Sequence, residues 1–173
     1  MIHLAIWKTT YSIRDGTIDG QGDELYMAEV MKIIFKGGSG WGPSEEAYGD
    51  KVTITPNSIE YLYEPATESE CNPKLKWSYR TSSPLFLRLY QEVAARTLSI
   101  MDDPNDVFCT DVGGIEINVS FSDRSKRKRR WFCTGDHFRE CFSLIRQMVP
   151  GCESVPAVLS TNEDDPADGN QDE

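Results

Sequence analysis

Several features that identify particular protein classes are missing from this sequence. Its 173 residues contain no apolar run near the roughly 18 residues that a membrane-spanning helix needs, which argues against a helical membrane protein. No two cysteines have the C-x-x-C spacing of many zinc and redox motifs. The glycine-rich segment 37–43 lacks the Gly-Lys-Ser/Thr end of a P-loop. The hydrophobic fraction of 39% instead indicates a globular protein, and we expect no cofactor.

A secretory signal is also missing from the first residues. Their apolar stretch is interrupted by His3 and Lys8, and no small-residue cleavage site follows. The five cysteines are an odd number, which favours reduced thiols and a cytoplasmic location. Residues 1–30 have no apolar periodicity after the start. We interpret them as a disordered leader or a misassigned start, with translation beginning at Met27 or Met31.

Negative charge is concentrated at the two ends of the chain. The formal net charge is -10, from 18 Lys and Arg against 28 Asp and Glu. Residues 153–173 include acidic residues but neither Lys nor Arg, whereas the segment between the two ends is nearly neutral. From residue 160 onward the sequence has no apolar side chain larger than Ala, so it cannot bury enough surface to fold. We therefore predict a disordered acidic tail over 160–173 and a single domain over 31–159.

Period-two alternation of apolar residues predicts most of that domain to be antiparallel sheet. Pro56 and Asn57 separate two alternating stretches and indicate a hairpin, and Asp123–Ser125 indicates a second one. The predicted strands cover 31–36, 51–55, 58–64, 74–80, 114–122 and 126–133.

Two segments have helical spacing instead. The first begins at Ser82 or Ser83 with Pro84 in its first turn and ends at 102–105, and the second begins at Asp136 and stops before Pro150. The order β-β-β-β-α-β-β-α predicts an α+β fold, in which two helices pack on one face of an antiparallel sheet of about five to six strands.

The most prominent motif is a run of five basic residues, Lys126, Arg127, Lys128, Arg129 and Arg130. Such a run could contact nucleic-acid phosphates. A strand exposes alternate residues on opposite faces, however, so this one would carry cations on both faces and cannot lie in the middle of a buried sheet. We favour an edge strand, where Lys and Arg block pairing with other chains, or a strand neutralised by the acidic tail.

Cys133, His137 and Cys141 are spaced four residues apart, with Cys109 or Cys152 available as a fourth ligand. A zinc site or a thiol-dependent enzyme could use this set. Cys141 falls within the apolar stripe of the second helix, and cysteine is a common small core residue. We therefore favour buried thiols over metal binding or catalysis.

Large aromatic residues provide a different kind of candidate site. Trp41 lies in the glycine-rich loop, while Trp77, Tyr79 and Trp131 lie on predicted strands. An exposed Trp on a loop is a common binding contact. We predict that these four residues contact a ligand or partner, and that the protein binds a protein or a small ligand without catalysis. Nucleic acid is the less favoured partner, and no membrane is expected.

Several stretches resemble a family of small bacterial proteins that have an acidic C-terminal tail and no known activity. They are Val52–Pro56, Ser58–Tyr61, Asn72–Tyr79, Phe108–Gly113, Gly135–Phe138, Met148–Glu153 and Pro156–Leu159. The resemblance covers the chain from residue 31 to about 165 and leaves out the first 30 residues. It implies no catalytic residue and no cofactor.

Overall fold

The fold is built on one six-stranded sheet, seen in a computed structural model that describes residues 28–40, 43, 45–103, 113–132, 134 and 136–159. All strand pairs are antiparallel, and the strand order is β4-β3-β2-β1-β5-β6. The strands are β1 (Val30–Gly38), β2 (Tyr48–Thr55), β3 (Ser58–Pro65), β4 (Leu75–Arg80), β5 (Ile115–Phe121) and β6 (Lys126–Trp131). This confirms the α+β class and the predicted element order.

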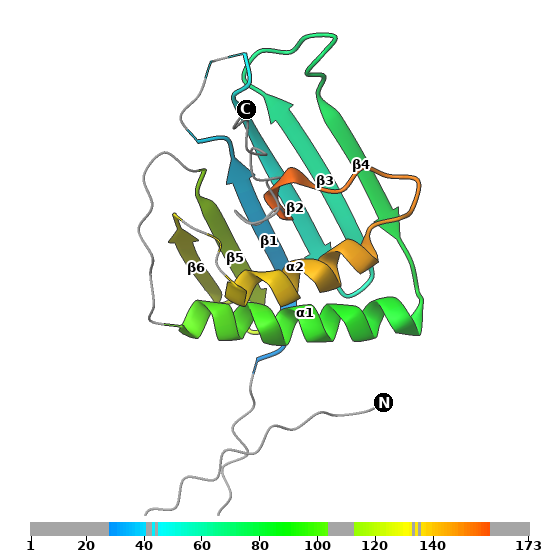
Figure 1. Cartoon of the computed structure of the whole chain (residues 1–173). Coiled ribbons are helices and arrows are strands. Elements are labelled where there is room, and N and C mark those ends of the chain that lie inside the picture. The colour runs from blue at the N-terminus through cyan, green and yellow to red at the C-terminus, as the bar shows by residue number, and fades with distance from the viewer. Residues whose placement is uncertain are drawn as a thin grey trace, which may run out of the picture.

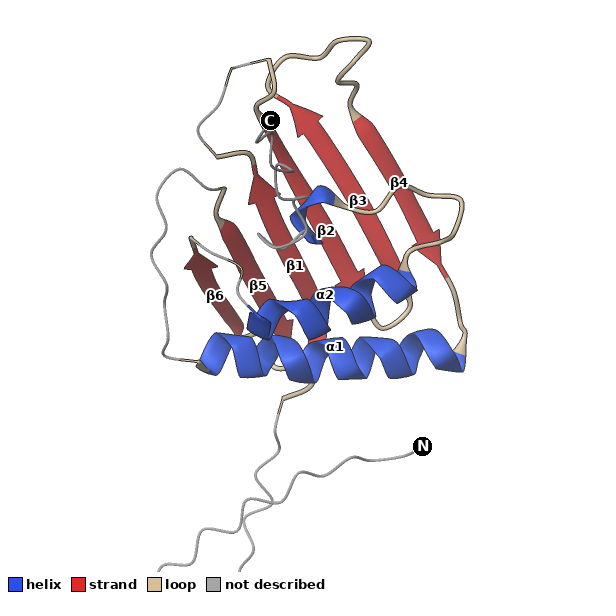
Figure 2. Cartoon of the chain, viewed as in Figure 1, coloured by secondary structure: helices blue, strands red, loops and turns tan. Residues whose placement is uncertain are grey.

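Two helices and a short 3-10 turn cover one face of the sheet (Figure 1). They are α1 (Pro84–Asp102), α2 (Asp136–Met148) and η1 (Ala157–Leu159), and Figure 2 shows all three in front of the strands. Ser83 is the N-cap of α1 and Pro84 lies in its first turn, as the sequence predicts, although the Ser83 side chain makes no capping hydrogen bond. No helix in the described part of the chain is long and apolar enough to cross a membrane.

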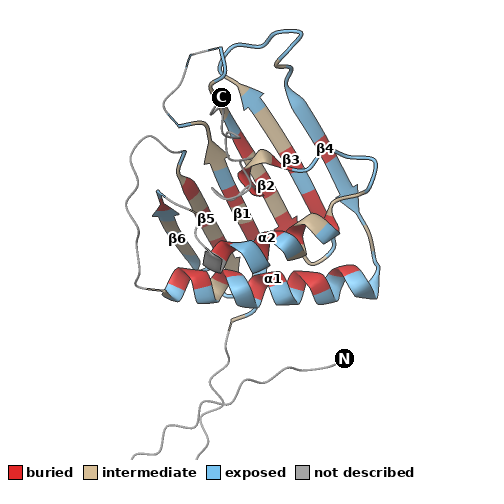
Figure 3. Ribbon diagram, viewed as in Figure 1, coloured by how far each residue is buried: buried red, intermediate tan, exposed pale blue. Residues whose placement is uncertain are grey.

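The core lies between the sheet and the helices. Cross-strand neighbours such as Ile33, Ile54 and Val119 are fully buried and point toward the helices. Figure 3 shows the buried residues along the strands and on the inward sides of α1 and α2. The predicted stripe of α2 is confirmed: Phe138 packs edge-to-face on Trp131 at 5.5 Å, and Phe142 packs on Phe35 at 6.1 Å.

The order of the strands follows from long-range pairing rather than from the hairpins alone. β1 lies between β2 and β5, so the hairpins β2–β3 and β5–β6 flank it on either side. Ile33 pairs with both Ile54 and Val119, which places three apolar side chains in one row. A Tyr90 hydroxyl on α1 donates to the Val30 carbonyl at 2.9 Å and attaches the helix to the start of β1. The edges of the sheet are therefore β4 and β6.

Candidate functional site

β6 is the strand that contains the basic run, and it lies at one edge of the sheet. It pairs only with β5 among the described strands, with Asn118 opposite Lys128 and Val119 opposite Arg127. The edge position was the favoured alternative from the sequence, and it is confirmed. Because alternate side chains point to opposite faces, the five cations divide into two groups with different surroundings.

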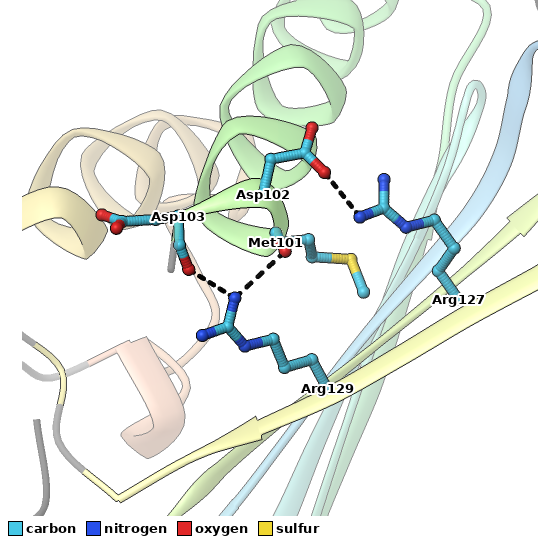
Figure 4. A network of polar contacts seen from close by, with 5 residues as sticks. All are labelled: Met101, Asp102, Asp103, Arg127 and Arg129. Atoms are coloured by element: carbon cyan, nitrogen blue, oxygen red, sulfur yellow. Dashed lines mark hydrogen bonds and ion pairs between the residues drawn. The ribbon is translucent and has the colours of Figure 1, made fainter. Parts of the chain in front are cut away.

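Arg127 and Arg129 point to the helix-covered side and contact the end of α1 (Figure 4). Arg127 Nη2 donates to Asp102 Oδ1 at 2.6 Å. Arg129 Nη1 donates to the carbonyls of Met101 at 3.1 Å and Asp103 at 2.5 Å. The last carbonyls of a helix have no partner within the helix and carry partial negative charge. These two arginines therefore join the edge of the sheet to the C-terminal end of α1 and stabilise the fold.

Lys126, Lys128 and Arg130 point to the opposite side, which no described helix covers. Lys128 Nζ lies 2.7 Å from Glu116 Oε2 on β5, and Lys36 Nζ on β1 lies 3.4 Å from Glu116 Oε1. The hydrogen bond from Lys128, followed by one from Asn118 at 2.9 Å, lowers the pKa of Glu116 to about 2, and Lys36 adds a smaller contribution. Glu116 thus stays ionised at any ordinary pH and holds two lysines of neighbouring strands in place.

The same open side of the sheet collects cations from β1, β2, β4 and β6. We call this surface the basic face. By register it carries Lys32, Lys36, Lys51, Lys76, Arg80, Lys126, Lys128 and Arg130. The acids on the strands of this side are Glu60, Glu64 and Glu116, and Lys74, just before β4, pairs with Glu64 at 2.5 Å.

Lysine is therefore segregated within the described part of the chain. All of its lysines lie on or beside the basic face, whereas α1 and α2 carry Arg and no Lys. Ile34 and Leu62 lie half-buried among the charged residues and give the face a small apolar component. A surface of this kind can bind an anion-rich chain through long-range attraction and short contacts with mobile ammonium groups.

Most of the predicted aromatic contacts do not lie on this surface. Trp131 is 1% exposed and Trp77 is 8% exposed, so both belong to the core. This corrects their placement on an accessible surface, because alternation alone could not tell which of the two faces the helices cover. Tyr79 is 39% exposed at the edge strand β4 and packs against Phe86 at 6.2 Å. Trp41 lies outside the described residues.

Cys141 is a core thiol. It is fully buried, and its sulfur lies 3.7 Å from the Thr97 hydroxyl. Burial raises the pKa of the thiol to about 12, which keeps it protonated and unlike the thiolates that bind zinc. Cys109, Cys133 and the His137 side chain lie outside what is described. The described residues contain no cluster of three or more His, Cys, Asp or Glu able to hold a metal.

The residues that sequence reasoning missed are those that complete the basic face. Lys32, Lys36 and Lys51 were not singled out, although each occupies an outward position in an alternating strand. Alternation along each strand shows which residues share a side of that strand. The strand order is also needed to bring these residues together on one face, and the sequence does not give that order. Glu116 was likewise an ordinary outward residue of β5 until the fold placed two lysines beside it.

Comparison with known proteins adds no assignment. The sequence matches no protein-family model, and no curated protein shows significant similarity to it. The resemblance to a bacterial family thus stays a prediction.

Proposed function

We propose that the protein is a non-catalytic binding protein, and that its basic face holds an acidic segment of a partner protein. The observation that supports this most directly is the gathering of every described lysine on one face of the sheet. Surface charges in a globular protein are ordinarily interspersed, so a surface on which eight cations face three acids favours steering of an oppositely charged partner.

The spacing of the cations fits an extended chain. Lys126, Lys128 and Arg130 follow one another at every second residue of β6. At about 3.3 Å per residue, their backbone positions are about 6.6 Å apart. An extended peptide with acids at alternate positions has the same repeat, so its carboxylates can meet these cations one by one. Ile34 and Leu62 offer apolar contacts near the centre of the same surface.

An acidic protein segment suits this surface better than a nucleic acid. Sequence-tolerant binding of single strands depends on aromatic side chains that stack on bases. No aromatic side chain occupies an outward position on the described strands β1, β2, β3, β4 and β5. Phe132, just past β6, is 38% exposed, and Arg130 stacks over its ring at 5.4 Å.

A cytoplasmic location and a bacterial origin complete the proposal. The odd number of cysteines supports a reducing compartment, and the family resemblance supports a bacterial source. Cys71 and Cys152 are exposed free thiols, which suits such a compartment.

Binding of a fluorescently labelled oligoglutamate peptide tests the proposal. We expect binding at low ionic strength that weakens steeply with salt, because the Debye length falls from about 10 Å at 0.1 M to about 3 Å at 1 M. The variant Lys126→Gln/Arg130→Gln should bind about five- to tenfold more weakly, at up to about 1 kcal/mol per exposed charge pair.

A matched control separates location from net charge. Arg88→Gln/Arg96→Gln removes the same positive charge from the outer side of α1, where both arginines are exposed. This variant should bind the peptide as the unmodified protein does. Equal losses in the two variants would contradict a specific face. Tighter binding of a deoxythymidine oligonucleotide of matched charge would replace the acidic peptide by a nucleic acid as the partner class.

A further inference from the structure

The last described residues are fastened to the covered side of the sheet by hydrogen bonds from several elements. The Val158 N–H donates to Asp50 Oδ2 at 2.7 Å, and the Trp77 indole N–H donates to the Ser154 carbonyl at 3.2 Å. Arg146 Nη2 on α2 donates to the Leu159 carbonyl at 2.6 Å. Leu159 itself is fully buried. The point from which residue 160 continues is therefore fixed in space.

That point lies close to the end of the sheet where β1 finishes and β2 begins. A Cβ at Gly37 would stand 2.7 Å from Val158 Cγ2, so the chain crosses β1 in direct contact. Gly37 pairs with Asp50, and the next pair along the strands is Lys36 with Lys51, which points to the basic face. From Asp50 to the start of β2 at Tyr48 is only about 7 Å along the strand.

The sequence that follows has the length and charge to reach the basic face. Residues 160–173 include no Lys or Arg, and their acids are Glu163, Asp164, Asp165, Asp168, Asp172 and Glu173. Fully extended, this segment would span about 46 Å at about 3.3 Å per residue. The distance across the sheet from β4 to β6 is about 24 Å at about 4.8 Å per strand. The segment can therefore pass the end of the sheet and still cross the lysine-bearing surface.

We propose that residues 160–173 occupy the basic face and compete there with an external acidic partner. This inference rests on the proposed function, because it assigns the same surface a resident occupant. An attached segment has an effective concentration on the order of millimolar, so even a weak interaction fills the face most of the time. A partner must then displace the tail. Binding is therefore limited to segments that contact the basic face more strongly than the spaced carboxylates of the tail do.

Amine labelling of the full chain tests occupancy without any external ligand. Lys36 and Lys51 lie nearest the fixed exit point, and mass spectrometry can follow the acylation rate of each lysine. The tail variant is Glu163→Gln/Asp164→Asn/Asp165→Asn/Asp168→Asn. In it, both lysines should react about threefold faster or more, as expected if the tail covers them for two thirds of the time. High salt should raise the rates in the unmodified chain and leave the tail variant unchanged.

The control variant Glu92→Gln/Glu140→Gln removes negative charge from the outer sides of α1 and α2, where both residues are exposed. Its labelling rates should match those of the unmodified chain. If the tail variant also matches, the tail does not occupy the face and the inference is wrong.

Binding of the oligoglutamate peptide distinguishes this failure from a failure of the proposed function. With the tail in place as proposed, the tail variant should bind the peptide about threefold more tightly than the unmodified chain, or more, because the tail leaves only about a third of the faces free. Equal, measurable affinities would overturn the inference and leave the binding function intact. No binding of the peptide by either protein would overturn the proposed function. If the lysines of the unmodified chain were still protected from acylation in that case, the basic face would contact only the tail of its own chain.

Discussion

The two faces of β6 place the same kind of side chain in different surroundings. On the covered side, Arg127 and Arg129 are bonded to the end of α1 and are half-buried. On the open side, Lys126 and Arg130 are exposed, and no acidic partner is found for them among the described residues. A run of cations in a sequence is therefore not one structural feature, because strand geometry places alternate members against α1 and on the open side of the sheet.

Substitutions at the C-terminal end of β6 should show the largest difference in stability between the covered side and the open side of the strand. Trp131→Ala should lower the free energy of unfolding by about 3–5 kcal/mol, because it removes a buried indole that packs on Phe138. Arg130→Ala, one residue away on the open face, should change it by less than about 0.5 kcal/mol. Urea denaturation measures both. Trp131→Phe should cost less than Trp131→Ala, since the indole N–H has no hydrogen-bond acceptor among the described residues.

The next largest effect separates two cations within the basic run. Arg129→Gln should destabilise the protein by about 1–2 kcal/mol, because it removes charged donors from two carbonyls and a cation from 5.0 Å above the Trp131 ring. Lys128→Gln loses one exposed ion pair and should cost about 0.5 kcal/mol or less. Thermal unfolding of the two variants gives the comparison. Similar losses would mean that the helix contact contributes little.

The fold was accessible from the sequence to the extent that it depends on local patterns. The alternation in β2 and β3, the turn at Pro56 and the stripe of α2 each specify their own element. The pairing of β1 with β5 was not accessible, since it joins residues 80 (Lys36 and Glu116) to 91 (Val30 and Phe121) positions apart. Exposure was not accessible from the local pattern either: Leu85 has the helical spacing of the buried Leu89 on α1, yet it is 57% exposed.

The candidate site likewise has one part that a local sequence pattern predicts and one part that depends on long-range pairing. The basic run and its edge position could be inferred from β6 alone, because cations on both faces are incompatible with a central strand. The basic face could not, because its cations come from four strands, β1, β2, β4 and β6, whose order depends on the pairing of β1. The end of α1 as a partner for Arg129 was equally hidden, since it requires the helix to cross the sheet at one particular place.

A smaller effect concerns a carboxylate on the covered face. Burial is the main cause that raises the pKa of Asp50, and donors at Val158, Tyr61 and Gly37 offset it only in part. An acid whose pKa is raised by folding adds stability below its unfolded pKa near 3.8, and this stability is lost as pH rises through the folded value. The unmodified protein should therefore gain stability relative to Asp50→Asn as the pH falls. Urea midpoints of both proteins across this pH range provide the measurement, and a constant difference would contradict the shift.

The smallest effect should appear in binding rather than in stability. Glu116→Gln releases Lys36 and Lys128 from their shared carboxylate on the open face. Affinity for the oligoglutamate peptide should rise about two- to threefold, within the range of a single exposed charge. Fluorescence anisotropy can detect the change, and Glu60→Gln, on β3 of the same face, compares a carboxylate for which no ion pair is described. A fall in affinity would mean that Glu116 orients the lysines for binding.

The separation of lysine from arginine has a chemical consequence. Acylating agents neutralise primary amines and leave guanidinium groups charged. In the described part of the chain, such a reagent would therefore discharge much of one side of the sheet, while Arg127 and Arg129 kept their bonds to α1. Reversible acylation of this protein would therefore lower the positive charge of the basic face without breaking the hydrogen bonds that join β6 to α1.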